Sequence, residues 1–190
     1  LREITDWEKP IYVKVGATRT YYDVKLAVHS GADVVVVDGM QGGTAATQEV
    51  FIEHVGIPTL AAIPQAVQAL QELGVHRTQA SGADRKGVQL IVSGGIRTGA
   101  DVAKALALGA DAVAICTAAL IALGDNHPRY QAEYEKIGSA AGFFDDFQDG
   151  RDPAGISTQD PELAARLDPV EGGRRLANYL RVLTMEAQTI

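Results

Sequence analysis

The sequence predicts an α/β fold, namely the C-terminal half of a (β/α)8 (TIM) barrel followed by a C-terminal extension, and three observations lead to it. Short apolar runs alternate with segments of helical spacing over residues 1–124. The run Val34–Val37 is four valines without polar alternation, which is typical of a parallel strand buried on both faces. Residues 27–37 and 105–115 repeat one design, in which a helix, Gly-Ala-Asp and an apolar strand follow one another.

Each expected strand is a short apolar run, and each expected helix places apolar residues on one side. Pro10 precedes the first strand, and Gly31 and Gly74 stop the first two helices as C-caps. The expected strands are Ile11–Val15, Val34–Val37, Val88–Val92 and Ala112–Ile115. The expected helices are Tyr21–His29, Gln65–Leu73, Asp101–Leu108 and Val170–Ala187.

Residues 1–124 hold four strand–helix units, whereas a complete barrel needs eight units and about 250 residues. The sequence opens almost directly on a strand, so we expect the later half of a barrel, either as a truncated product or as an excerpt of a longer chain. A doubly wound sheet also fits the alternation, but the glycine-rich turns at the strand ends favour the barrel. Residues 125–190 are expected to form a loop excursion after the barrel and a C-terminal helix of the same domain.

Composition excludes several classes of protein. The 190 residues carry a net charge of −7, which argues against a nucleic acid or an anionic membrane as partner. The uncharged run 112–124 has 13 residues and is too short to span a bilayer. A single cysteine, Cys116, excludes an internal disulfide framework and a site with several cysteine ligands, and a cytoplasmic setting is expected.

Two small-residue corners follow consecutive strands. Ser93, Gly94 and Gly95 stand at the carboxyl end of the third strand, where glycines let backbone N–H groups approach an anion. Thr117 and Ala118 follow the fourth strand and begin a helix whose N-terminus adds donors. The pair predicts a phosphate site, since barrels often bind phosphate after their last two strands. The alternative is two tight turns without a ligand.

Lys14 lies inside the apolar run of the first strand. A lysine there is costly unless its ammonium reaches a cavity or an anion. Alternation puts Tyr12 and Lys14 on one face of the strand, so we expect Lys14 to point into the barrel mouth, where it suits an electron-rich ring such as the N1–O2 edge of a reduced flavin. The alternative is a lysine extended outward along a helix.

The loop after the all-valine strand supplies further candidates. Asp38 and Gln41 are placed to hydrogen-bond a flat ligand, and Gly42, Gly43 and Thr44 form a loop able to lie close to it. The four histidines show no metal-ligand spacing, so no metal site is expected.

The sequence closely resembles the FMN-binding synthase domain of glutamate synthases and their stand-alone relatives, which are FMN-dependent oxidoreductases. The resemblance extends over residues 9–190 and covers the later half of that domain. It rests on the runs Tyr-Val-Lys-Val-Gly, Asp-Gly-Met-Gln-Gly-Gly-Thr-Ala-Ala and Val-Ser-Gly-Gly-Ile-Arg-Thr-Gly-Ala-Asp-Val, and on the later segment 150–163.

The resemblance implies a barrel that holds FMN at its carboxyl face and reduces 2-iminoglutarate, formed from 2-oxoglutarate and ammonia, to L-glutamate. It makes Lys14, Asp38 and Gln41 the candidate catalytic residues, with Lys14 against the flavin ring. The FMN-binding candidates are Lys14, Gly42, Gly43, Thr44, Ser93, Gly94, Gly95, Thr117 and Ala118. Ammonia would come from solution or, through a glutaminase subunit, from glutamine. An electron-donor subunit is a further expected partner, and assembly as a homo-oligomer is left open.

The sequence departs from the family at its iron–sulfur ligands. The family carries three cysteines for a [3Fe–4S] cluster, one of them in a Cys-Pro step. Here that step is Asp152-Pro153, and Asp125 follows Gly124. Phe144 and Phe147 lie in the segment between these two positions. Carboxylates and phenyl rings cannot replace thiolates around iron–sulfur, so no cluster is expected and the electron route stays open.

Two alternatives to a glutamate synthase activity remain. One is a related FMN barrel with another substrate, such as one forming N-methylglutamate. A 2-hydroxy-acid oxidase is disfavoured, because no histidine follows the strand that ends at Val37-Asp38-Gly39. The other is a half-barrel fragment without catalytic activity.

Overall fold

The computed structural model of the chain describes residues 1–39, 54–79, 87–140 and 150–190. One sheet of four parallel strands forms its centre, in chain order from β1 to β4. The strands are β1 (Tyr12–Gly16), β2 (Val34–Asp38), β3 (Gln89–Ser93) and β4 (Ala112–Ala114). The four expected strands are confirmed to within one residue at each end, and so is the parallel α/β arrangement.

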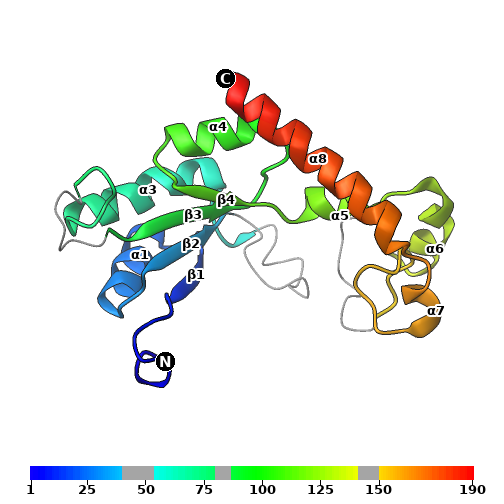
Figure 1. The fold of residues 1–190 in the computed structure, drawn as a ribbon, viewed down its shortest axis with the longest axis horizontal. Coiled ribbons are helices and arrows are strands. Elements are labelled where there is room, and N and C mark those ends of the chain that lie inside the picture. Colours follow the sequence, from blue (N-terminus) through cyan, green and yellow to red (C-terminus); the bar gives the residue numbers. More distant parts are fainter. Residues whose placement is uncertain (40–53, 80–86, 141–149) are drawn as a thin grey trace.

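Helices connect the strands and continue after the sheet (Figure 1). The α-helices are α1 (Thr20–His29), α3 (Thr59–Glu72), α4 (Gly99–Ala107), α5 (Thr117–Leu123), α6 (Gln131–Lys136), α7 (Pro161–Ala164) and α8 (Pro169–Thr189). Two 3-10 turns are η1 (Glu3–Thr5) and η2 (Pro128–Tyr130). Within the described ranges, no helix is both long and apolar enough to cross a bilayer.

Helix α3 begins six residues earlier than expected. The expectation started the helix after Pro64, because proline interrupts helical hydrogen bonding. The N–H groups of Ala61 and Ala62 both donate to the Pro58 carbonyl, so the first turn is complete before Pro64 is reached. Pro64 would have paired with Leu60, which is exposed, so the missing hydrogen bond costs little.

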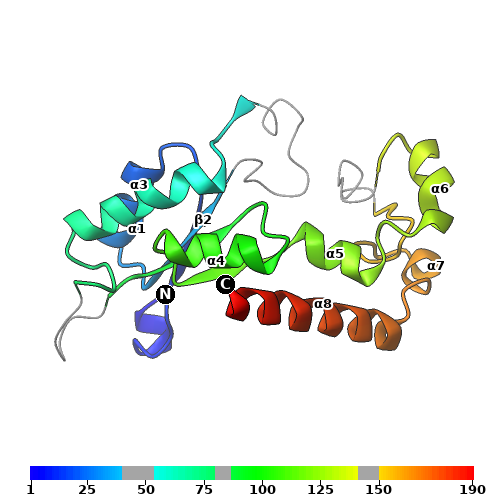
Figure 2. The ribbon, with the colours of Figure 1, turned by 90° about the horizontal axis from the view of Figure 1, so that it is seen from above.

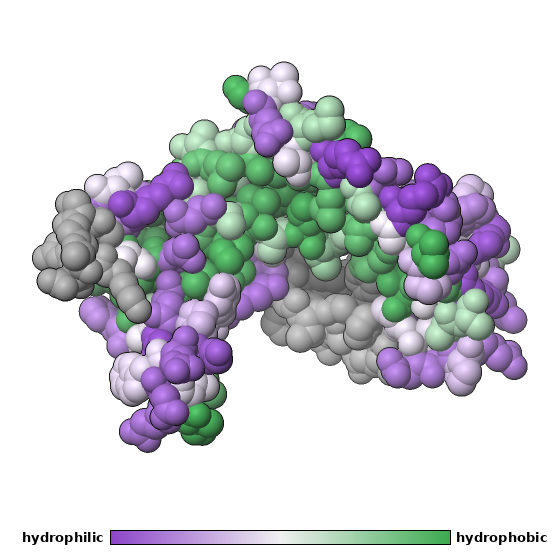
Figure 3. Space-filling model, viewed as in Figure 1, coloured by the Kyte–Doolittle hydropathy of each residue, from purple (hydrophilic) through white to green (hydrophobic). Residues whose placement is uncertain are grey.

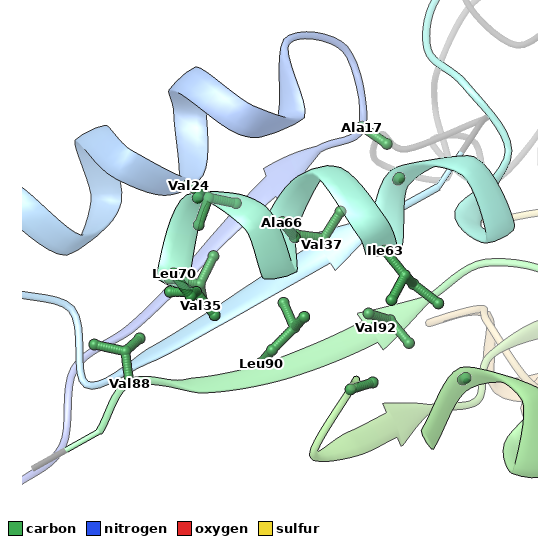
Figure 4. Close-up of a cluster of buried hydrophobic side chains, with 14 of the residues drawn as sticks. Ala17, Val24, Val35, Val37, Ile63, Ala66, Leu70, Val88, Leu90 and Val92 are labelled. Atoms are coloured by element: carbon green, nitrogen blue, oxygen red, sulfur yellow. The ribbon is translucent and has the colours of Figure 1, made fainter. Parts of the chain in front are cut away.

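The core lies between the sheet and the helices on one of its faces (Figure 4). Alternate residues of neighbouring strands share that face, namely Val13, Val15, Val35, Val37, Leu90 and Val92. Ile63 and Leu70 of α3 and Val24 of α1 cover them. Val36 points to the other face and is only half-buried, so the expectation that β2 is buried on both faces is wrong at this residue.

The repeated Gly-Ala-Asp has a structural cause at the amino ends of the strands. Asp33 accepts a hydrogen bond from the N–H of Ile11 at 2.7 Å, and Asp111 accepts one from the N–H of Leu90 at 2.8 Å. Each aspartate therefore ties the strand that it precedes to the beginning of the previous strand. An arginine joins each carboxylate, Arg2 in the first case and Arg77 in the second.

The C-terminal part extends away from the sheet along α8, which lies beside α4 and α5 (Figures 1 and 2). Helices α6 and α7 stand near the far end of α8. Tyr130, Tyr134 and Ala154 form a second, small core there. The long C-terminal helix is confirmed, and described residues of the segment before it pack in their own apolar cluster. In Figure 3, hydrophobic residues gather in the middle of the molecule, and hydrophilic residues are more frequent around α6 and α7 and in the N-terminal segment.

Candidate active site

Three strand ends meet at the carboxyl edge of the sheet. The register aligns Gly16, Asp38 and Ser93 on adjacent strands. We call residues 93–96, which leave β3, the glycine corner. The N–H of Gly39, just beyond β2, donates to the Ser93 carbonyl at 2.9 Å. The loops after β2 and β3 are therefore joined by their backbones, which places the predicted phosphate residues beside Asp38.

The two glycines of the corner are required for different reasons. Both have positive φ, +100° at Gly94 and +75° at Gly95, a conformation that favours glycine. A Cβ on Gly94 would lie 2.7 Å from the Gly39 carbonyl oxygen and 2.8 Å from the Thr59 hydroxyl, so this glycine permits close packing. A Cβ on Gly95 would meet none of the described residues within 4 Å, so this glycine borders space that they leave open.

The corner presents consecutive amides without acceptors. Within the described part of the chain, the N–H groups of Gly94, Gly95 and Ile96 donate to no other group. Backbone donors that lack an acceptor favour a bound anion or water. Successive N–H groups at a turn of positive φ are the kind of backbone that binds phosphate. The geometry thus fits the anion expected from the sequence.

The amides that follow are already occupied by carboxylates of the chain. Asp101 accepts from the N–H groups of Arg97 and Thr98, at 3.1 and 3.2 Å. Glu186 of α8 accepts from the N–H of Gly99 at 2.7 Å. Because these carboxylates fill the first turn of α4, an anion at this edge has the amides of the glycine corner and not those of the helix.

Lys14 and Asp38 form an ion pair on the face of the sheet opposite the helices. Lys14 Nζ lies 2.6 Å from Asp38 Oδ2. Tyr12 and Lys14 share that face, as alternation predicts. The Lys14 side chain is 58% exposed. No helix among the described elements covers this face.

The remaining predicted residues are placed only in part. Ser93 pairs with Ala114, so Thr117 and Ala118 begin α5 at the same edge of the sheet, one strand further on. Thr117 is exposed and Ala118 is partly buried. The other four candidates, Gln41, Gly42, Gly43 and Thr44, lie outside the described residues.

Sequence reasoning missed a buried cluster in the segment after the sheet. The Tyr134 hydroxyl lies 2.6 Å from Asp125 Oδ1 and 3.1 Å from Asp152 Oδ1. These two aspartates hold positions where the family resemblance expects cysteines, and the structure brings both to one phenol. Burial and the two carboxylates raise the pKa of Tyr134, so the hydroxyl keeps its proton.

Asp152 organises the loop that follows it. It accepts hydrogen bonds from the backbone N–H groups of Ala154, Ile156 and Ser157 at 2.8 to 2.9 Å. Burial alone would raise the pKa of Asp152, but these donors outweigh burial and hold the pKa below its usual value. The ionised carboxylate thus serves as the centre of a turn. In the described residues, no group of three or more His, Cys, Asp or Glu side chains is arranged to hold a metal ion.

Replacing Tyr134 with phenylalanine should destabilise this segment by about 1–3 kcal/mol, because the buried carboxylates lose a donor. Tyr130 is the matched control: it is equally buried, at 5%, but its hydroxyl contacts Arg129 at the surface. The Tyr130→Phe variant should unfold close to the wild type in urea. An equal loss of unfolding free energy in both variants would show that the hydrogen bonds from Tyr134 to the two aspartates are not the cause.

Comparisons with known proteins match the chain to glutamate synthases. The family model described as "Conserved region in glutamate synthase" matches residues 1–130. The chain is 72% identical over its whole length to the glutamate synthase large subunit-like protein of Rhizobium meliloti (strain 1021), of which it covers 41%. It is 41% identical over 191 aligned residues to the archaeal glutamate synthase (NADPH) of Methanocaldococcus jannaschii, of which it covers 32%.

A solved FabK mutant from Thermotoga maritima overlaps 70% of this chain, with a TM-score of 0.46 and 22% identity, a resemblance too weak to support an inference. The chain spans less than half the length of the two relatives named above. The match of the family model to more than half of the chain nevertheless decides its family. The chain belongs to the glutamate synthase family.

Proposed function

We propose that this chain is the flavin-phosphate half of an FMN-dependent (β/α)8 barrel that reduces 2-iminoglutarate, formed from 2-oxoglutarate and ammonia, to L-glutamate. The glycine corner is the observation that carries this proposal. Its three amides, which have no acceptor among the described residues, stand at the sheet edge that also holds the Lys14–Asp38 pair. An anion and an electron-rich ring would each find a suitable donor there.

The residues present fit FMN. The amides of Gly94, Gly95 and Ile96 suit a phosphate, and the space beside Gly95 leaves room for one. Lys14 supplies positive charge on the uncovered face, and Asp38 fixes the position of its ammonium group. FMN, when bound, supplies the hydride chemistry. The chain's own part is to hold the phosphate and to stabilise negative charge on the ring.

A barrel would also explain the uncovered face of the sheet. Strands β1 and β4 each pair on one side only among the described strands, and open parallel edges favour association. A further half of the barrel would pair with both edges and enclose Lys14. The greater length of the relatives supports this proposal, because most of their sequence lies outside the matched region.

Substrate and electron supply belong to the same proposal. We expect ammonia to come from solution or from a glutaminase subunit, and electrons to come from a donor protein. We expect no iron–sulfur cluster, because Asp125 and Asp152 lie on Tyr134 and hold positions that the family gives to cysteines.

The visible absorption spectrum tests the proposal first. The chain is mixed with FMN and desalted, both as given and joined to the upstream half of a relative's barrel. Flavin bands near one per chain support the proposal, and 2-oxoglutarate with ammonia should then reoxidise the reduced flavin. Bands in the joined protein alone would show that each half holds part of the site. The absence of flavin from both would contradict the proposal.

Replacing Gly95 with alanine should weaken FMN binding at least ~10-fold, because the methyl group enters the space assigned to the phosphate. Gly74→Ala is the matched control. Gly74 has φ of +68°, close to the +75° of Gly95, and its added Cβ also meets none of the described residues within 4 Å. Both variants bear a similar backbone strain of about 1 kcal/mol, so fluorescence titration with FMN should separate them. Equal affinities of Gly95→Ala and Gly74→Ala for FMN would show that the phosphate does not bind at the glycine corner.

A further inference from the structure

We propose that Thr59 is a positioning residue of the glycine corner, and that its hydroxyl aims the corner's amides at an anion. The inference rests on the proposed function only for the identity of that anion as the phosphate of FMN. Thr59 is the first residue of α3 and carries no role in the sequence motifs. Its hydroxyl lies 2.8 Å from the carbonyl oxygen of Ser93 and 2.8 Å from that of Gly94.

The peptide plane transmits this contact to the amides. In a trans peptide the C=O of one residue and the N–H of the next point in opposite directions. Holding the Ser93 carbonyl toward Thr59 therefore turns the Gly94 N–H away from Thr59. Holding the Gly94 carbonyl does the same for the Gly95 N–H. The single hydroxyl proton is shared between the two carbonyl oxygens, and the hydroxyl thus restrains two of the three amides that have no acceptor among the described residues.

The corner needs such a restraint because a glycine backbone has little conformational restriction of its own. Two consecutive glycines have wide conformational freedom, and ordering them on binding would reduce affinity. The Ser93 carbonyl receives a second donor, the N–H of Gly39 at 2.9 Å. The Gly94 carbonyl has the Thr59 hydroxyl as its donor in the described structure. The Gly95 amide should therefore be the most sensitive to the loss of that hydroxyl.

Packing fixes Thr59 itself. A Cβ on Gly39 would collide with the hydroxyl and the backbone of Thr59, so the loop after β2 lies directly against the start of α3. The N–H of Ile57 donates to the carbonyl of Ala17 at 2.8 Å, which ties the segment before Thr59 to the loop after β1. The loops after β1 and β2 thus hold the Thr59 hydroxyl in place, and the hydroxyl in turn donates to the loop after β3.

The test compares Thr59→Val with Thr59→Ser. Valine keeps the shape and loses the hydroxyl, whereas serine keeps the hydroxyl. The affinities of the purified protein for FMN and for riboflavin are measured by fluorescence titration, because riboflavin has the ring without the phosphate. Thr59→Val should weaken FMN about fivefold and leave riboflavin unchanged, and Thr59→Ser should keep the preference of the wild type. Thr184→Val is the control, since it removes a hydroxyl-to-carbonyl bond within α8.

A second readout needs no flavin. NMR relaxation of the Gly94 and Gly95 amides should show greater mobility in Thr59→Val than in the wild type, and wild-type mobility in Thr59→Ser. If the wild type binds no flavin but these amides loosen, the positioning role holds and the proposed function fails. Unchanged amides together with an unchanged preference for FMN would overturn the inference. A Thr59→Ser variant that loses the preference for FMN would also overturn the inference. This comparison remains decisive if Thr59→Val does not fold.

Discussion

Replacing Gly99 with alanine should destabilise the chain by about 3 kcal/mol, the upper range for an overpacked site. Gly99 is the first residue of α4, and α8 lies directly on it. An added Cβ would lie 2.6 Å from both the Glu186 Cβ and the Leu183 carbonyl oxygen. Separation of the helices to admit the methyl group would also break the 2.7 Å hydrogen bond from the Gly99 N–H to Glu186. Urea unfolding of the purified chain measures the loss.

The chain contains its own control for this substitution. Gly173 is also helical, in α8, and a Cβ there meets no other residue within 4 Å in the described part of the chain. Gly173→Ala should stabilise the chain by up to about 1 kcal/mol, because alanine is the better helix former. The same chemical change is therefore expected to have opposite signs at the two sites. A neutral Gly99→Ala would mean that α8 does not rest on the start of α4.

The strands could be predicted from the sequence because their signal is local. Each of β1, β2 and β3 carries β-branched or leucine side chains on the face that meets the helices, and pairing follows chain order. The sequence shows Gly-Ala-Asp as a repeat but does not show why it recurs. Its cause is a hydrogen bond that each aspartate accepts from the strand before it, from the backbone N–H of Ile11 or Leu90.

The contacts that shape the site could not be predicted, since they join residues far apart in the chain. Thr59 reaches the glycine corner from 34 residues away, and Glu186 caps α4 from a distance of 87 residues. Neither contact leaves a periodic pattern in the sequence. Tyr134 was missed for the same reason, although the two aspartates beside it had been singled out as departures from the family. The face on which Lys14 lies followed from alternation, but its exposure depends on what covers the sheet.

Lys14→Met should lower the rate of flavin-dependent turnover by about 100-fold, the typical cost of removing one preorganised donor from developing negative charge. The fold should be affected far less. The Lys14 side chain is 58% exposed, and an ion pair at that exposure contributes about 0–1 kcal/mol. Lys104→Met, an exposed lysine of α4 on the helix side of the sheet, is the control and should keep full activity.

The position of Lys14 makes this loss separable from loss of the cofactor. The phosphate donors belong to the glycine corner on β3, whereas Lys14 stands on β1 with β2 between them. Lys14→Met should therefore still bind FMN near stoichiometry while its turnover falls, which absorption and rapid-reaction measurements of the same sample resolve. A variant that turns over like the wild type would show that the Lys14–Asp38 pair serves only the sheet. A variant that loses FMN along with turnover would place the phosphate at Lys14, and the three amides of the corner would then need another partner.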